Sequence, residues 1–330
     1  MGFGAFIVRA VFSAGLILGV VIGAAHAQAA VDTKAAVDVN APVDVSALAE
    51  TKSATAPKAR VIKIAAAKPE FAIAQDYFVQ LLRKALEAGA NGRTVPTINE
   101  TQLMEQDLGV QEMIRGKKVD VYWMGTDLDR ERKLRAIRIP LDRGLIGHRR
   151  FIIQQRMKGA FDGVADINSL RSYSACQGVD WPDTKVLRNA GLNVREIISF
   201  ERIFHEVSTL HCEYFPRGYF EGFSEVEQRK ATYPDLMFYE NLILNYPFAL
   251  YFFVNPKDEA LARWIETGLE KMIDTGEFIK IMENHPLTRG VFPLNKVKNL
   301  RWITIENPGM PAGTDYKNPR YWFQPEDFQK

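Results

Sequence analysis

The sequence predicts a two-lobed α/β protein in which each lobe is a mostly parallel sheet flanked by helices. Strands and helices alternate in two separate series, one before residue 125 and one after residue 171, and such alternation predicts parallel sheets with helical crossovers. Two extended apolar segments, Gly147–Gln155 and Leu242–Val254, follow the two series. The strongest helical pattern comes after the second segment. We therefore expect the chain to return to the first lobe, so that two crossings form a hinge.

The composition indicates a soluble globular protein and argues against a nucleic-acid partner. The 330 residues suffice for two ordinary domains. Hydrophobic residues make up 47% of the chain and charged residues 25%, as in soluble domains. Lysine and arginine number 42 against 40 aspartates and glutamates, and no basic run stands out. A nucleic-acid binder needs a concentrated positive face, which this balance does not provide.

The N-terminus has the pattern of a cleavable signal peptide over residues 1–27. Arg9 is the only charge ahead of an apolar run, Ala10–Ala25, and Ala25-His26-Ala27 gives the small-x-small cleavage pattern. The alternative is an uncleaved membrane anchor, but the run is short for a span of ~20 residues. Residues 28–60 are low in complexity and poor in large apolar side chains. We expect them to form a disordered tether.

Each element of the first series has its own signal. The helix after Pro69 places Phe71, Phe78 and Leu82 on one face. Glycines at positions 92 and 116 stop the two helices. The predicted elements are strand Val61–Ala67, a helix from Pro69 to Asn91, strand Val95–Ile98, helix Asn99–Arg115, strand Val119–Met124 and the short strands Ile137–Pro140 and Arg149–Ile153.

The second series repeats this alternation. Asp183 or Thr184 is expected to cap a short helix that Gly191 ends. The next helix places Phe200, Phe204 and neighbouring apolar residues on one face. The predicted elements are strand Ser172–Gln177, helix Asp183–Asn189, strand Val194–Ser199, helix Phe200–Leu210 and strand Glu213–Phe215.

The last third of the chain is expected to return to the first lobe. The apolar run Leu242–Val254 is broken by Pro247 and is interpreted as the return crossing. Helix Asp258–Ile273 has the clearest apolar face, and Gly276 interrupts it. The tail from residue 307 is rich in proline, glycine and aromatics and is expected to wrap the surface. Lobe 1 is thus predicted to comprise 61–150 with 243–330, and lobe 2 to comprise 151–242.

Two cysteines, Cys176 and Cys212, are permitted to pair in an exported protein. They are placed on neighbouring parallel strands, Cys176 near the end of one strand and Cys212 at the start of the other. That offset would stretch a bond that needs Cα atoms within ~7 Å. We therefore favour two buried free thiols, which pack as small apolar residues.

Several short motifs, taken in order, resemble one protein family over about Val61–Pro286. Each motif is weak alone, but their order and spacing are similar to those of type II periplasmic solute-binding proteins, in particular the family that serves polar amino acid ABC transporters. The matching segments are Gly116–Asp120, Glu131-Arg132 with Ile139-Pro140, Leu170–Gly178, Phe200–Tyr214, Tyr246-Pro247 and Asp274–Phe278.

The resemblance implies a non-enzymatic, monomeric receptor in the periplasm, without a cofactor, that closes two lobes on a small solute. It also implies delivery of the solute to a membrane permease or sensor. The family's arginine for the ligand carboxylate maps onto Arg149 or Arg150. The family's aspartate for the ligand ammonium maps onto Tyr214–Gly218, where this chain has Arg217 and no acid. The expected solute is therefore an anion with at least one carboxylate.

The arginines are the main candidate site residues. Arg149 and Arg150 point to opposite faces of a strand, so at most one faces the cleft, and its planar fork suits a carboxylate. The alternative is a solvated hinge pair. Arg217 lies between Pro216 and Gly218, and its alternative role is a salt bridge to Glu221 or Glu213. Arg143 either adds to the positive field or pairs with Asp142.

The remaining candidates lie at or near strand ends, where ligands bind in open parallel sheets. Asp183 is interpreted as a helix cap rather than a ligand contact, and Tyr122 as a core or cleft residue. The histidines are too scattered for a metal site. The candidate ligand contacts are Gln177 and Gly178 ahead of a helix, Gly125 and Thr126 as hydrogen-bond donors, and Trp123 and Trp181 as an apolar wall.

Two other functions remain open on the same fold. One is a sensory input protein for a membrane signalling partner. The other is a periplasmic dehydratase-like enzyme with a carboxylate in the cleft, for which Glu221 and Glu225 are the candidates. The chain contains no GxSxG, HExxH or phosphate-binding loop.

Overall fold

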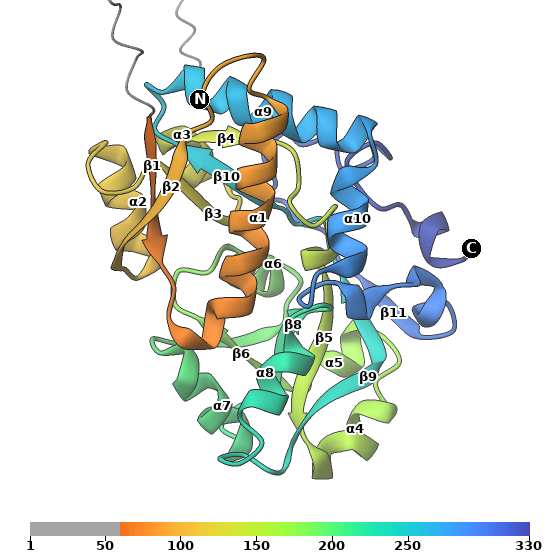
Figure 1. Ribbon diagram of the computed structural model, residues 1–330. Helices are drawn as coiled ribbons and strands as arrows, with labels where there is room; N and C mark the ends of the chain where they lie inside the picture. Colours follow the sequence, from red (N-terminus) through yellow and green to blue (C-terminus); the bar gives the residue numbers. More distant parts are fainter. Residues whose placement is uncertain (1–59) are drawn as a thin grey trace, which may run out of the picture. The chain divides into compact units, whose positions relative to one another are not determined.

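The computed structural model describes residues 60–330, which form a mixed α/β body of two lobes (Figure 1). The predicted signal peptide and the tether up to residue 59 lie outside the described residues. Within residues 60–330, no helix combines the length and apolarity needed to cross a bilayer.

Lobe 1 contains two small sheets covered by helices. In one sheet β1 and β2 are parallel, and in the other β10 lies antiparallel between β3 and β4. Its strands are β1 (Val61–Ala66), β2 (Thr97–Leu103), β3 (Val121–Gly125), β4 (Arg135–Ile137) and β10 (Leu250–Val254). Its helices are η2 (Pro69–Phe71), α1 (Ala72–Ala88), α2 (Gln106–Ile114), α3 (Leu128–Lys133), α9 (Glu259–Asp274) and α10 (Glu277–Asn284).

Lobe 2 is built on one six-stranded sheet in the order β11-β9-β5-β8-β6-β7. β5 is antiparallel to β8 and β9, whereas β6 is parallel to β7 and β8. Its strands are β5 (His148–Gln154), β6 (Ser174–Gly178), β7 (Asn193–Ile197), β8 (Tyr214–Gly218), β9 (Leu236–Asn245) and β11 (Arg301–Thr304). Its helices are α4 (Lys158–Asp162), α5 (Ile167–Leu170), α6 (Pro182–Asn189), α7 (Phe200–Ser208) and α8 (Gly222–Gln228).

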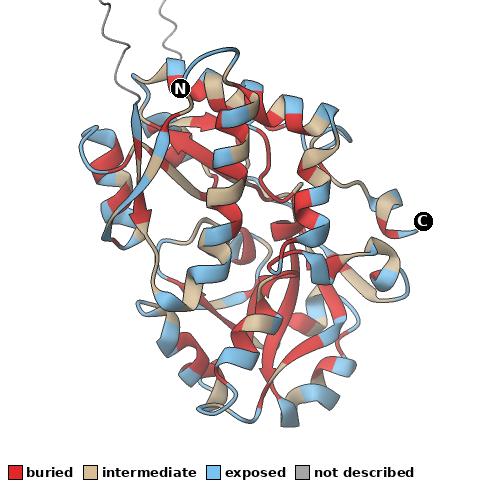
Figure 2. Cartoon of the chain, in the orientation of Figure 1, coloured by how far each residue is buried: buried red, intermediate tan, exposed pale blue. Residues whose placement is uncertain are grey.

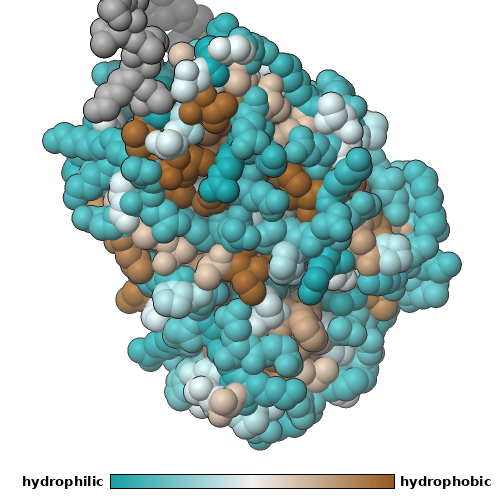
Figure 3. Space-filling view, viewed as in Figure 1, coloured by the Kyte–Doolittle hydropathy of each residue, from teal (hydrophilic) through white to brown (hydrophobic). Residues whose placement is uncertain are grey.

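Short 3-10 turns join these elements at η3 (Leu145–Gly147), η4 (Gln155–Met157), η5 (Arg289–Val291), η6 (Leu294–Val297) and η7 (Pro325–Phe328). Figure 2 shows buried residues along the central strands of lobe 2 and along the inner faces of the lobe 1 helices. Every residue of β5 is buried, as expected for a strand covered on both faces. Hydrophilic residues predominate on the face drawn in Figure 3, and the largest hydrophobic areas there lie over lobe 1.

The packing of α1 on α9 shows how tightly lobe 1 is built. A Cβ at Gly268 of α9 would lie only 1.8 Å from the backbone oxygen of Ala85 in α1. Glycine therefore permits the two helices to approach closely. This contact holds α9 against α1.

The structure corrects the prediction of a helix over Asn99–Arg115. β2 covers Thr97–Leu103, and the helix α2 begins only at Gln106. Residues 99–103 pair as part of a strand with β1 instead of forming a helix. This pairing satisfies backbone N–H and C=O groups of β1 and outweighs the local helical preference of the segment. The short elements α3, α4, α5, α8 and β11 carry no clear periodicity and are not predicted from the sequence.

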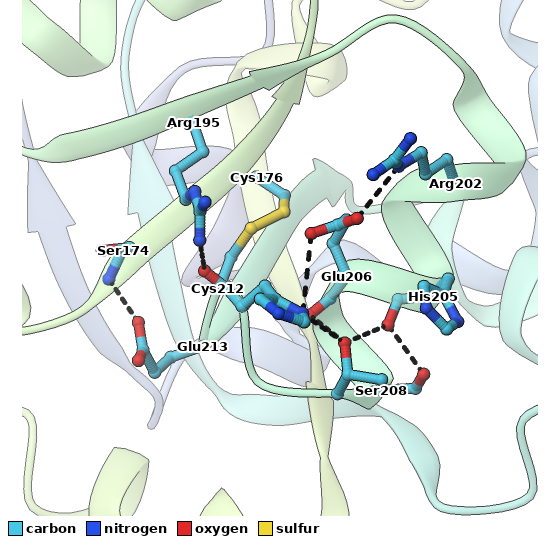
Figure 4. Close-up of a disulfide and its surroundings, with 11 residues drawn as sticks. Ser174, Cys176, Arg195, Arg202, His205, Glu206, Ser208, Cys212 and Glu213 are labelled. Atoms are coloured by element: carbon cyan, nitrogen blue, oxygen red, sulfur yellow. Dashed lines mark hydrogen bonds and ion pairs between the residues drawn. A yellow bond between two sulfur atoms is a disulfide. The ribbon is translucent and has the colours of Figure 1, made fainter.

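The preference for free thiols is also wrong, because Cys176 and Cys212 form a disulfide (Figure 4). Their Cα atoms are 5.6 Å apart. The predicted offset assumed that Cys212 begins the strand. Instead β8 begins at Tyr214, opposite Ala175, and the preceding residues bend alongside β6. The backbone N–H of Glu213 already donates to Ser174 O at 3.0 Å.

Candidate functional site

The carboxyl ends of β6 and β8 and the start of β5 bring charged side chains together at one end of the lobe 2 sheet. Because β5 is antiparallel to β8, Arg149 pairs with Gly218 and Arg150 with Arg217 in the ladder. Ligands of open α/β sheets bind at the carboxyl ends of parallel strands. This end of the sheet is therefore the candidate site.

Arg149 is buried, with 2% of its surface exposed, and faces two carboxylates. Its Nη2 lies 3.1 Å from Asp183 Oδ2 and its Nη1 lies 3.8 Å from Glu221 Oε2. The guanidinium also lies 5.6 Å from the ring of Tyr246 and 5.5 Å from that of Phe248. Burial alone would lower the pKa of Arg149, but Tyr246, Asp183 and Glu221 together raise it.

Asp183 lies in the first turn of α6 and does not cap it, which corrects the predicted role. The N-cap residue is Trp181, and no side chain caps the helix. Asp183 Oδ2 instead accepts hydrogen bonds from Gln177 Nε2 at 3.0 Å and from the hydroxyl of Tyr246 at 3.2 Å. Asp183 thus holds Gln177, Tyr246 and Arg149 in one buried network.

Arg217 is held by carboxylates and by aromatic rings. Its Nε and Nη2 donate to Glu225 at 2.8 and 2.6 Å, and Nη2 also lies 3.1 Å from Glu221. Burial alone would lower the pKa of Arg217, but Glu221 and Glu225 raise it overall. Its guanidinium lies 5.1–5.5 Å from the ring centres of Trp181, Phe200 and Phe215. The expected alternative of a salt bridge to Glu221 is present, and Glu225 is a second partner.

Arg150 lies on the other face of β5. Its guanidinium is 4.4 Å from the ring of Tyr219 and 3.8 Å from Glu240. Burial lowers the pKa of Arg150, and Tyr219 and Glu240 offset this only in part. The alternation along the strand therefore separates Arg150 from Arg149, and only Arg149 joins the network around Asp183.

Gly178 and Trp181 line the loop between β6 and α6. A Cβ at Gly178 would lie 2.4 Å from the indole of Trp181, so the absence of a side chain lets the ring lie flat over the loop. This places Trp181 against Arg217.

The candidate residues of lobe 1 make most of their contacts with other residues of lobe 1. The Thr126 hydroxyl donates to Glu131 Oε1 at 2.7 Å, and the Thr126 N–H donates to Ala249 O at 2.9 Å. A Cβ at Gly125 would lie 2.5 Å from the ring of Phe248. Trp123 stacks on Phe78 with ring centres 5.5 Å apart. Trp123 is thus largely a packing residue.

Arg130, which the sequence did not single out, is the most unusual charge at this end of β3. Only 9% of it is exposed, and its Nη1 donates to Gly125 O at 2.6 Å. No carboxylate oxygen of residues 60–330 lies within 4.0 Å of its guanidinium. Burial lowers the pKa of Arg130, and Asp127, Asp107 and Asp183 offset this only in part. In the sequence, nothing distinguishes Arg130 from the neighbouring Arg132.

Arg143 lies away from the other candidates. Its Nη2 donates to Pro319 O at 2.7 Å, and with Arg289 it lines a separate cavity of about 740 Å³. Asp142 does not pair with it, because its carboxylate accepts the backbone N–H groups of Gly144 and Ile146 at 3.0 and 2.8 Å. Burial raises the pKa of Asp142 to about 7.

Several polar atoms around Asp183 have no hydrogen-bond partner within the described part of the chain. They are Arg149 Nε, Gln177 Oε1 and Thr184 Oγ1. Buried polar groups are normally satisfied, so such atoms point to a missing partner. The same residues, 60–330, contain no cluster of three or more histidines, cysteines or acids suited to a metal ion.

A scan against protein-family models and a search of curated proteins give no match. Solved structures do match. An ancestral arginine-binding protein bound to arginine has a TM-score of 0.51 and 15% identity, over 68% of this chain and 97% of that one. A histidine kinase sensor domain with similarity to periplasmic binding proteins has a TM-score of 0.52 and 16% identity, over 69% and 96%.

A probable amino-acid ABC transporter extracellular-binding protein from Bacillus subtilis has a TM-score of 0.50 and 14% identity, over 69% of this chain and 99% of that one. These identities are too low to carry function, so the likeness concerns the fold alone. The chain has the two-lobed α/β fold of the type II periplasmic solute-binding proteins.

Proposed function

We propose that this protein is a non-enzymatic receptor that binds a small carboxylate-bearing solute between its lobes. The observation that carries the proposal is Arg130, a buried cation without a carboxylate partner among residues 60–330. A buried charge is costly unless it is paired. A carboxylate of the solute would supply the missing partner and would fit the fork of the guanidinium at two points.

Arg149 and Arg217 are less suited to this role, because each already faces carboxylates of the chain. The solute carboxylate is therefore assigned to Arg130 on lobe 1. Arg149 Nε and Gln177 Oε1 on lobe 2 would then bind other polar groups of the solute, since both lack partners. Asp183 lies beside them, so an amino group on the solute would also find an acceptor.

The solved relatives of this fold support a receptor. Their names describe amino-acid binding, ABC transport and a histidine kinase sensor. The proposed mechanism is hinge closure at the two crossings, which buries the solute and presents the closed form to a partner. An enzymatic role for Glu221 or Glu225 is less favoured, because both carboxylates already pair with Arg217.

The first experiment is a native mass spectrum of the purified protein, which would reveal a co-purified solute. A thermal-shift panel would then compare carboxylic acids, including amino acids, with their amides. We expect the acids to raise the melting temperature and the amides to fail. The receptor proposal with a carboxylate solute is wrong if the amides stabilise the protein equally well.

The assignment to Arg130 has a matched control on the same helix. Arg132 is exposed and pairs with Asp129, so Arg132→Met should leave solute affinity unchanged. Arg130→Met should weaken the binding of acids about 30-fold or more, as expected for a lost buried charge pair. Equal affinities of the two variants would refute the assignment.

The likeness to a histidine kinase sensor domain keeps a signalling role as the second candidate. Uptake of a labelled solute by cells with and without the protein separates the two roles. A transport subunit is required for uptake, whereas a sensor leaves uptake unchanged and alters the activity of its membrane partner.

A further inference from the structure

Lobe 2 contains a complete binding site for a guanidinium group, and a side chain of the protein fills it. The site, here called the Arg217 cage, consists of Trp181, Phe200, Phe215, Glu221 and Glu225. We infer that Arg217 occupies the position that a cationic side chain of a solute would need, so that the receptor selects solutes without one. This inference deepens the proposed function and rests on it.

The cage has the features by which proteins recognise a guanidinium. Glu225 accepts two hydrogen bonds from Arg217, at 2.8 and 2.6 Å, in the paired geometry that suits the fork. Glu221 adds a second carboxylate at 3.1 Å. Three rings surround the same group with centres 5.1–5.5 Å from the guanidinium carbon. Arg217 is only 6% exposed, so these contacts are shielded from water.

The cage lies on the side of lobe 2 that contacts lobe 1. Arg217 lies near the carboxyl end of β8, where solutes of this fold bind. Glu221 is shared with Arg149, which joins the network around Asp183. Phe200 contacts Phe71 of lobe 1, with ring centres 4.9 Å apart. A solute held by lobe 1 would therefore meet the cage on closure.

The cage determines which solutes fit. A solute with a guanidinium or ammonium side chain would have to displace Arg217 or share its two carboxylates. Either arrangement leaves one cation without a partner in a buried site, which disfavours binding. A compact solute with a neutral or acidic side chain meets no such penalty. The Arg217 cage, occupied by Arg217 itself, thus disfavours the binding of cationic solutes.

The inference is tested with variants that open or refill the cage. Arg217→Ala removes the guanidinium and leaves room, whereas Arg217→Met removes the charge but keeps most of the volume. Each protein is titrated calorimetrically with methylguanidinium. We expect Arg217→Ala to bind it at least about tenfold more tightly than Arg217→Met and the natural protein do. A folded Arg217→Ala protein without this gain would overturn the inference.

Two further outcomes keep the test decisive. The natural protein is titrated with L-arginine and with its neutral analogue L-citrulline, and tighter binding of L-arginine would overturn the inference. If the Arg217→Ala variant does not fold alone, adding methylguanidinium during refolding should restore its folding, and adding methylammonium should not. Failure of this rescue also counts against the cage. The methylguanidinium titrations need no natural solute. They therefore still test whether the cage binds a guanidinium group even if the proposed receptor function is wrong.

Discussion

The rings of Phe71 and Phe200 lie 4.9 Å apart, although Phe71 directly precedes α1 of lobe 1 and Phe200 begins α7 of lobe 2. A second contact between the lobes is the ion pair of Asp129 and Lys185, with an N–O distance of 3.6 Å. Because both charged groups are substantially exposed, that pair contributes little. The aromatic contact is therefore the stronger of the two in holding the lobes together.

Replacing Phe71 by alanine should favour the open form and weaken solute binding. An aromatic pair is worth ~0.5–1.5 kcal/mol beyond its buried area, so we expect affinity to fall about fivefold. Calorimetry would measure the affinity, and small-angle scattering the spread of the free protein. Ile73→Ala, two residues along and 40% exposed, is the control. The idea fails if both variants bind the solute as tightly as the natural protein.

The fold was largely predictable where local periodicity and packing agree. Four elements lie close to their predicted positions, namely β1, α1, β5 and α9. In each of them the spacing of apolar residues favours one type of secondary structure clearly over the other. The run Leu242–Val254, broken by Pro247, is predicted to be the return crossing, and it passes from the end of β9 in the lobe 2 sheet to β10 in the lobe 1 sheet. Its pattern does not indicate which strands lie beside β9 and β10. Strand partners depend on distant segments, which periodicity cannot reveal.

The candidate site was predictable in part for a similar reason. Arg149, Arg217, Trp181 and Gln177 do lie together, since strand ends of one sheet meet at one edge. No feature of the sequence indicated Arg130 as a site residue. Its burial depends on which face of the short helix α3 packs against β3, and a helix of that length has no reliable pattern.

The disulfide should stabilise lobe 2 substantially. Cys176 and Cys212 are 36 residues apart, and closing a loop of that length is worth about 3–4 kcal/mol in the chain-entropy account. Urea unfolding of Cys176→Ala, Cys212→Ala and the double variant would measure the loss. Either single change breaks the bond, so the double variant should be little worse than one single variant. Losses that simply add would indicate two independent thiols.

Asp142 should make the stability of the protein depend on pH. This carboxyl is fully buried, and burial raises its pKa from 3.8 to about 7, although the N–H groups of Gly144 and Ile146 oppose the shift. Between those two values the folded state keeps a proton that the unfolded state releases. Raising the pH therefore favours unfolding across that interval, and the stability contributed by the protonated form is lost by about pH 7.

The loss is on the order of 4 kcal/mol, since each pKa unit corresponds to about 1.4 kcal/mol. Asp142→Asn cannot ionise, so its stability should not fall with pH in this way and should exceed that of the natural protein above neutral pH, even though its amide oxygen can accept only one of the two N–H groups. Urea unfolding from pH 4 to 8 would measure both proteins, with the exposed Asp315→Asn as control. Parallel pH profiles for all three would show that the buried carboxyl titrates normally, because a group with the same pKa in both states cannot change stability with pH.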